Sequence, residues 1–383
     1  MDIVEEPTLQ NKAGDQMETE LDSDHTELRS YITEDLHIIP EIVSGIHSTD
    51  REVRLAATVK VRRLLQKLQP EEAVQPVINS GLLEAVVGML SSVDLVFRAE
   101  AAWILTNVAS GTPEQTSAVV LAGAIPKLVG LFPCESTDAM DNALWALGNI
   151  GGDSDRLRDL AVQEGALKPM LDVLDRPEQH PHKLVETASW ALTCYLTPGR
   201  GDDLGYGVTR HMIPILVKFI KTTTNEKLEP LTEGMKALDY ISCSDAAVEA
   251  IIATGITPRL VELCTATKDD LRFHALRCVG QFTAGSEAST EAAIQAGLLS
   301  ALKSCIPSEH GDTRTTACWA ASNIAAGSLS QARTLFDNDL IPLILGVISN
   351  PAEQIKTRHE ASWVLSTLIG KGQEDNDLLF RLV

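Results

Sequence analysis

The stretch Trp103-Ile-Leu-Thr-Asn107 decides the fold, because variants of it return at an even spacing along the 383-residue chain. Each of the five tryptophans opens such a phrase, and two weaker phrases are opened by methionine and arginine. We call the opening residue of each phrase a rung. The rungs are 42 to 45 residues apart, at Trp103, Trp145, Trp190, Met235, Arg277, Trp319 and Trp363. A fixed period in this range predicts a solenoid of stacked helical repeats.

A second recurring phrase marks a corner inside each repeat. It is a glycine followed by the apolar start of a helix, and the glycines are Gly81, Gly123, Gly165, Gly255 and Gly297. Glycine ends a helix in a left-handed cap, and a proline is tolerated in the first turn of the next helix. The fourth and seventh repeats read His211-Met-Ile-Pro214 and Asp339-Leu-Ile-Pro342, without the glycine. The two phrases together predict three helices per repeat, of which the third carries the rung.

The fold class expected from this pattern is all-α, an armadillo-repeat, right-handed superhelical solenoid of about eight three-helix repeats. An alanine two positions before most rungs is expected to let neighbouring helices approach closely. The third helices are expected near residues 54–66, 97–110, 138–151, 184–196, 230–242, 271–283, 313–326 and 357–369.

The two ends of the chain differ from the repeats. Residues 1–36 hold eleven acidic and two basic residues. We therefore expect residues 1–30 to form an acidic disordered arm and residues 31–383 to form the solenoid. The last six residues, Leu378-Leu-Phe-Arg-Leu-Val383, resemble the opening of another repeat. They either fold back as a cap or leave an end face open to self-association.

Composition narrows the function classes. Apolar residues make up 44% of the chain, and the formal net charge of −21 argues against a nucleic-acid-binding surface and favours basic partners. No run of 18 apolar residues and no basic-then-apolar start is found, so neither a membrane span nor a secretion signal is expected. Seven cysteines without a CxxC pair indicate buried thiols in a reducing compartment. The expected localisation is cytoplasmic and nuclear.

The rung and the residue four positions later share one helix face. That later residue is an asparagine at Asn107, Asn149 and Asn323. An amide can hold both the N–H and the C=O of an extended peptide, and stacked indoles leave slots for lysine or arginine side chains. Asp153 and Glu360 are the carboxylates that would select cations. The alternative, that the rungs are core packing, is disfavoured because asparagine is a poor core residue and one rung is an arginine.

The second and third repeats, from Phe97 to Thr116 and from Ala143 to Asp153, resemble those of the importin-α (karyopherin-α) family. The resemblance runs from about residue 40 to the end and includes the arginine rung. Importin-α proteins are nuclear-import adaptors that bind lysine-rich localisation signals in a concave groove, at a major site on repeats two to four and a minor site on repeats six to eight. The resemblance implies a major site of Trp103, Asn107, Gly111, Thr116, Trp145, Asn149, Asp153 and Trp190, and a minor site of Arg277, Trp319, Asn323, Glu360 and Trp363.

The chain departs from the family pattern in several places. The asparagine is replaced by Cys194, Gln281 and Thr367, and the fifth phrase, from Met235 to Asp239, is expected to contribute no slot. In the family a basic N-terminal segment recruits importin-β, whereas here that place is acidic. The chain is therefore identified as a divergent member expected to lack the importin-β-binding segment and the last repeats.

No P-loop, Rossmann glycine pattern, nucleophile elbow or HExxH occurs, so no enzyme, catalytic residue, cofactor or metal site is expected. His180 and His182 are expected to be solvated loop residues, and Lys60-Val-Arg-Arg63 is expected to be the solvated face of a helix.

The expected function is an importin-α-like adaptor for nuclear protein import that binds lysine- and arginine-rich signals as extended peptides in its groove. The alternative is a non-transport armadillo scaffold or a dedicated chaperone that sequesters a basic partner. Basic cargo proteins are the expected partners, and an importin-β-type carrier is expected only if it binds without the basic segment. Nucleic acid and membranes are not expected.

Overall fold

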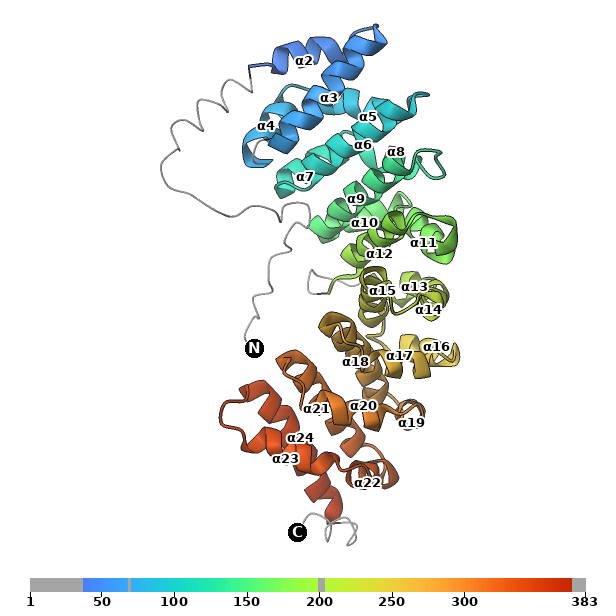
Figure 1. Cartoon of the computed structure of the whole chain (residues 1–383), viewed down its shortest axis with the longest axis vertical. Coiled ribbons are helices and arrows are strands. Elements are labelled where there is room, and N and C mark those ends of the chain that lie inside the picture. Colours follow the sequence, from blue (N-terminus) through green and yellow to red (C-terminus); the bar gives the residue numbers. More distant parts are fainter. Residues whose placement is uncertain (1–36, 68–69, 199–203, 374–383) are drawn as a thin grey trace. The chain divides into compact units, whose positions relative to one another are not determined.

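The structure, a computed structural model, describes residues 37–67, 70–198 and 204–373, without the side chains of residues 70–73 (Figure 1). The acidic arm and the apolar end run predicted above lie outside the described residues. Every regular element in the described ranges is a helix, and none is a strand. The chain divides into two compact units, Met1–Ala166 and Leu167–Val383, which are described one at a time.

The first unit is a stack of helical repeats. Its long helices α3, α6 and α9 carry the third-helix phrases, and α6 packs against both α3 and α9. The described helices of this unit are α2 (Ile39–Ile46), α3 (Arg51–Lys67), α4 (Pro70–Asn79), α5 (Leu82–Met89), α6 (Leu95–Ala109), α7 (Pro113–Leu121), α8 (Ala124–Val129), α9 (Thr137–Asp153) and α10 (Asp155–Gln163).

The second unit repeats the same plan. Its long helices α12, α15, α18, α21 and α24 pack each against the next, and they carry the remaining rungs. The described helices of this unit are α11 (Leu167–Asp175), the 3-10 turn η1 (Pro177–Gln179), α12 (His182–Leu196), α13 (Gly205–Thr209), α14 (Ile213–Thr222), α15 (Leu228–Ile241), α16 (Asp245–Ala253), α17 (Thr257–Leu263), α18 (Asp269–Ala284), α19 (Glu287–Gln295), α20 (Leu298–Cys305), α21 (Gly311–Ala326), α22 (Leu329–Asp337), α23 (Leu340–Ser349) and α24 (Ile355–Gly372).

Small side chains set the close stacking of the third helices. The alanines two positions before the rungs are completely buried, at Ala101, Ala143, Ala188, Ala275, Ala317 and Ala361. A methyl group lets the neighbouring backbone approach, whereas a larger side chain would overpack the contact. Their burial agrees with the expectation that they let neighbouring helices approach closely.

Local sequence explains where the helices begin. Asp94 accepts from the Val96 amide to cap α6, and Ser136 accepts from the Ala139 amide to cap α9. Thr112 forms a complete capping box at the start of α7, where proline occupies the first turn. These side chains satisfy amides that have no partner within the helix.

The corners follow the predicted glycines. Gly81, Gly123, Gly165, Gly255 and Gly297 all have positive φ, as a left-handed cap requires. In the seventh repeat Asp339 adopts the same conformation, with a φ of 56°. Aspartate tolerates this region better than most residues, although less well than glycine. In the fourth repeat the chain instead forms the short helix α13, which opens at Gly205.

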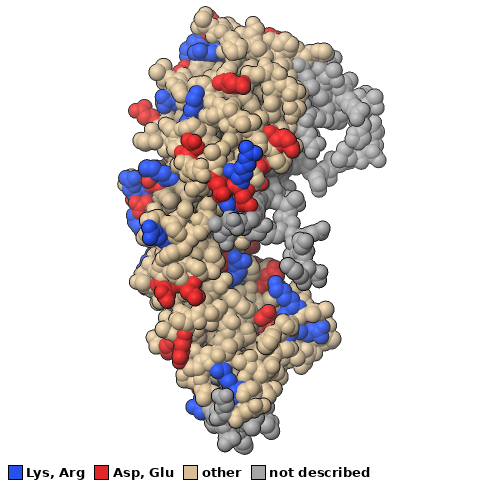
Figure 2. Space-filling model, turned by 180° about the vertical axis from the view of Figure 1, so that it is seen from behind, with Lys and Arg blue, Asp and Glu red and all other residues tan. Residues whose placement is uncertain are grey.

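Three further properties bear on function. No helix of the described ranges is long and apolar enough to cross a bilayer. Cys264, Cys278, Cys305 and Cys318 are buried, whereas Cys134 and Cys194 are half-buried and Cys243 is exposed, so the expectation of buried thiols was wrong for the last three. Figure 2 shows acidic and basic side chains interspersed on the face that it displays.

Candidate functional site

The tryptophan rungs are not a closed core. Trp103 is 36% exposed and Trp363 is 52% exposed. Trp145, Trp190 and Trp319 are half-buried. Each of these indoles therefore presents part of its surface to solvent, as a ligand-binding rung requires and as full core packing would not.

The first unit brings together Trp103, Asn107, Trp145, Asn149 and Asp153, which we call the α6–α9 site. The Asn149 amide nitrogen Nδ2 donates to the Thr106 carbonyl at 3.3 Å, so α6 fixes the orientation of this amide. An amide held in this way still offers a carbonyl oxygen and a second N–H to a ligand. The side-chain amide is thus set in place before any peptide binds.

Asn107 is the least satisfied group of the α6–α9 site. Its Nδ2 atom is enclosed by the protein and has no hydrogen-bond partner among the described residues. A buried donor without an acceptor costs about 1–3 kcal/mol. A peptide carbonyl that accepted from Asn107 would remove this cost.

One face of the Trp103 indole is already covered by the protein itself. The Arg62 guanidinium carbon lies 4.5 Å from the indole centroid. Glu100 accepts from the Arg62 Nε at 2.6 Å, and Gln66 accepts from Nη1 at 2.8 Å. The Arg62 side chain is only 16% exposed, so the expectation that it belongs to a solvated basic face was wrong. The α3 side of Trp103 is therefore closed to a ligand cation.

Gly111 and Thr116 shape the corner between α6 and α7. A Cβ atom on Gly111 would lie 1.9 Å from the Gln115 Oε1 atom, which accepts from the Thr112 amide, so a larger residue there would displace this side chain from the capping box. The Thr116 hydroxyl donates to the carbonyls of Ala109 and Thr112 and is 1% exposed. Both residues hold the local backbone, and a direct contact of either with a ligand stays a prediction.

Asp153 is the last residue of α9 and is half-buried. A helix C-terminus carries partial negative charge on its free carbonyl groups. The carboxylate adds a full charge at the same place, so this end of the α6–α9 site favours a cation.

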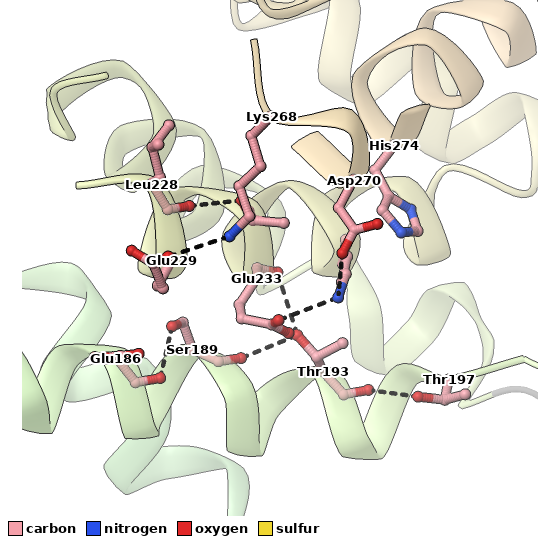
Figure 3. A network of polar contacts seen from close by, with 12 residues as sticks. Glu186, Ser189, Thr193, Thr197, Leu228, Glu229, Glu233, Lys268, Asp270 and His274 are labelled. Carbon is pink, nitrogen blue, oxygen red and sulfur yellow. Dashed lines mark hydrogen bonds and ion pairs between the residues drawn. The ribbon is translucent and has the colours of Figure 1, made fainter. Parts of the chain in front are cut away.

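The second unit begins its ladder with Trp190 on α12. Its i+4 position is Cys194, which offers no amide, and the membership of Trp190 in the major site stays a prediction. Figure 3 shows that polar contacts instead link α12, α15 and α18. The Thr193 hydroxyl donates to the Glu233 carbonyl at 3.2 Å, and Lys236 donates to the Glu233 carboxylate at 3.2 Å.

The fifth and sixth repeats pair their charged side chains with each other. Met235 is completely buried, in keeping with the prediction that the fifth phrase contributes no slot. Asp239, four residues later, is buried and accepts two bonds from the Arg277 Nε, at 3.0 and 2.8 Å. His274 Nδ1 lies 2.8 Å from the same carboxylate. The Arg277 charge is therefore already paired within the chain.

The last two tryptophans are held differently. A Cβ atom on Gly280 would lie 2.4 Å from the Trp319 ring, so this glycine lets the indole lie on α18. Asn323 donates to the Thr283 hydroxyl at 3.4 Å. On α24, Trp363 donates from its indole N–H to His359 at 3.1 Å, and the Glu360 side chain is 22% exposed. We call Trp319, Asn323, Glu360 and Trp363 the α21–α24 site.

The sequence did not predict which side chains of the protein already contact the proposed binding residues. Arg62 and the Asp239–Arg277 pair were hidden because their partners lie 38 to 41 positions away in sequence. The only available signal was the repeat register, which places consecutive third helices side by side. His180 also differs from expectation, since it is half-buried and burial lowers its pKa.

Comparison with known proteins agrees with the helical plan. The model of the armadillo/beta-catenin-like repeat matches residues 112–151 and 286–326. The crystal structure of an engineered protein, a target of the Northeast Structural Genomics Consortium, matches with a TM-score of 0.76 at 25% identity, over 86% of this chain and 78% of that chain. The armadillo fold class predicted from the rung spacing is confirmed.

Two plant importin subunits are similar in sequence to much of the chain. Importin subunit alpha-1a of Oryza sativa subsp. japonica is 33% identical over 314 residues, which are 81% of this chain and 58% of that protein. Importin subunit alpha-2 of Arabidopsis thaliana is 36% identical over 237 residues, 61% of this chain and 43% of that protein. The chain spans about half the length of these relatives.

Proposed function

Because the chain belongs to the importin-α family, as a divergent member, we propose that it is an adaptor for nuclear protein import. It binds lysine- and arginine-rich localisation signals as extended peptides along the rungs. The α6–α9 site provides the stronger hold and the α21–α24 site a weaker one. Its cargo proteins are basic, and it works in the cytoplasm and the nucleus.

The observation that carries this proposal is the state of the two asparagines in the α6–α9 site. Asn149 is held in one orientation by Thr106, and the Nδ2 atom of Asn107 is enclosed and has no partner in the part of the chain that the structure describes. Both amides stand one helical turn after a partly exposed indole, on the same helix face. An extended peptide supplies the carbonyl groups that these amides require, independently of its sequence.

Selectivity for cations comes from the groups around the amides. The solvent-exposed part of an indole attracts a lysine or arginine stem and its charge, at about 0.5–2 kcal/mol per contact. Asp153 and the end of α9 add negative potential. A micromolar complex requires about 8 kcal/mol, so several rungs must act together with backbone hydrogen bonds of about 1 kcal/mol each.

The α21–α24 site supports a weaker hold because less of it is free. Arg277, which precedes it in the ladder, is paired with Asp239, and Asn323 donates to Thr283. Thr367 replaces the amide after Trp363. A peptide therefore finds one asparagine here, against two in the α6–α9 site.

The binding experiment uses fluorescence anisotropy with a labelled lysine-rich peptide and a matched peptide in which glutamine replaces lysine. The double variant Trp145→Ala/Asn149→Ala should weaken binding of the lysine peptide by at least 30-fold. The control is Leu121→Ala, which removes an 84% exposed apolar side chain on α7, away from the rungs. If the double variant folds, by its thermal unfolding, and still binds like the wild type, the site assignment is wrong.

Transport is tested apart from peptide binding. A transport adaptor should form a stable complex with importin-β while a basic cargo peptide is bound. Cargo binding without any carrier complex would leave the site assignment in place and favour the scaffold or chaperone function instead.

A further inference from the structure

A cavity of about 380 Å³ in the first unit contains no rung among its lining residues. It lies where the loops after α2 and α5 meet the first turns of α3 and α6. Its polar lining includes Ser48, Arg54, Ser91 and Ser92, and the Phe97 ring forms an apolar wall. The cavity is therefore small, lined about equally by polar and by apolar residues, and separate from the α6–α9 site.

Arg54 brings a positive charge to this cavity. Its guanidinium carbon lies 4.7 Å from the centroid of the Phe97 ring. The Nε atom is enclosed and has no hydrogen-bond partner in the described part of the chain. Because this atom is shielded from solvent, an anion in the cavity meets the charge of the Arg54 guanidinium rather than this N–H. Arg54 thus favours any anionic group that enters the cavity.

Arginines at the same place in other repeats show how Arg54 differs. Three of them donate to the backbone carbonyl six positions earlier and fasten the preceding loop, whereas Arg358 makes no such bond among the described residues and, like Arg54, has an enclosed Nε without a partner there. These bonds join Arg98 to Ser92, Arg272 to Ala266 and Arg314 to Ser308. The equivalent acceptor for Arg54 would be the Ser48 carbonyl, and no such bond occurs among the described residues. The donors that fasten a loop elsewhere are therefore available at Arg54.

The serine hydroxyls complete a set of donors. Ser48 Oγ accepts from the Asp50 amide at 3.1 Å, and Ser92 Oγ accepts from the Asp94 amide at 3.1 Å. Each hydroxyl therefore uses its oxygen for the loop and keeps its hydrogen for another acceptor. The first turns of α3 and α6 add the positive end of two helix dipoles.

The nearby carboxylates are compensated. Asp94 accepts from the Val96 amide at 3.0 Å and from Arg51 Nε at 2.8 Å. The Val96 amide, together with Arg51 and Arg54, holds the pKa of Asp94 below its usual value. Asp50 accepts from the amides at the start of α3. Asp94 thus has a counter-charge in Arg51, and Asp50 has two amide donors.

We propose that this cavity binds the phosphate of a phosphorylated serine or threonine side chain in a partner peptide. The Arg54 guanidinium and the hydroxyls of Ser48 and Ser91 donate to the phosphate oxygens. Phosphate suits the set better than a carboxylate does, because it carries more charge and offers three acceptor oxygens to several donors. Exposed Val53 and Val96, next in sequence to Arg54 and Phe97, provide apolar contacts for the rest of the peptide.

The test uses the full chain and three labelled peptides that differ at one position, which holds phosphoserine, serine or glutamate. We expect the phosphoserine peptide to bind at least tenfold more tightly than the other two. Arg54→Gln should abolish this preference, and Arg54→Lys should keep part of it. The control is Arg63→Gln, which makes the same change of charge on an exposed side chain of α3.

Three outcomes would overturn the proposal. Two of them are equal affinity for the phosphoserine and serine peptides, and a phosphate preference that survives in Arg54→Gln. A glutamate peptide that matched the phosphoserine peptide would also refute it, because the site would then recognise carboxylates. Thermal unfolding of each variant shows whether the first unit is intact.

The two binding activities can be separated. Trp145→Ala/Asn149→Ala should lose the lysine-rich peptide and keep the phosphoserine peptide, and Arg54→Gln should do the reverse. Failure of the cavity proposal therefore leaves the adaptor proposal untouched, and the converse also holds.

Discussion

Replacing Arg62 with alanine tests whether this side chain blocks one face of Trp103 in the α6–α9 site. The Arg62 guanidinium covers one face of Trp103 at 4.5 Å, and Glu100 holds it there. In Arg62→Ala a peptide cation can take that face, with Glu100 as its counter-ion. A cation–π contact contributes about 0.5–2 kcal/mol. We therefore expect a peptide with one more basic residue at the α3 end to gain about 2- to 30-fold in affinity.

The assay compares two labelled peptides, one of which extends past Trp103 by a single lysine. In the wild type the extra lysine should change the dissociation constant little, since Arg62 already occupies its slot. Removing any positive charge also strengthens binding of a basic peptide in general. Arg63→Ala controls for this, because Arg63 is exposed on the same helix. If Arg62→Ala raised the affinity of both peptides equally, or if Arg63→Ala gave the same increase, Arg62 would not be the group that blocks the lysine slot.

Three further predictions concern stability and reactivity. The Arg314 guanidinium, together with a backbone amide, holds the pKa of Glu353 below its usual value. The charged carboxylate thus stabilises the fold above about pH 4.3 and loses this effect as the pH falls through the lowered pKa. Glu353→Gln should cost about 1–3 kcal/mol in urea unfolding at pH 7, and less at pH 3; a pH-independent cost would contradict the pairing. Burial raises the pKa of the Cys264 thiol, so Ellman's reagent at pH 8 should modify exposed Cys243 at once and Cys264 only on unfolding; early modification of both would contradict the packing. Gly123→Ala should lower stability by about 1–2 kcal/mol in thermal unfolding, since φ there is 76°, and an unchanged midpoint would contradict the left-handed corner.

The repeat period made the fold predictable. Regular spacing of Trp103 and its equivalents predicts stacked third helices, because each repeat must bury its apolar face on a neighbour. The glycines predict the corners, because little else adopts positive φ without strain. Asp339 escaped this rule, since a residue that only tolerates the left-handed region carries no unambiguous signal in sequence.

The candidate site was predictable in outline and not in detail. The pairing of an indole with an asparagine at i+4 follows from helix geometry alone, as at Trp145 and Asn149. Side-chain contacts between repeats do not follow from it, because any of several charged residues on the facing helix can reach the same point. The stacking of Arg62 on Trp103 and the pairing of Arg277 with Asp239 belong to this second kind.

The stacking of each third helix on its immediate neighbours has a consequence for how such a protein diversifies. A residue on the exposed edge of one third helix can change without disturbing the helices two repeats away. The fifth rung illustrates this freedom, because Met235 is buried where other repeats present an indole, yet α12, α15 and α18 still pack in order. Single repeats can therefore lose, block or change their ligand-binding side chains while the stack of third helices stays intact.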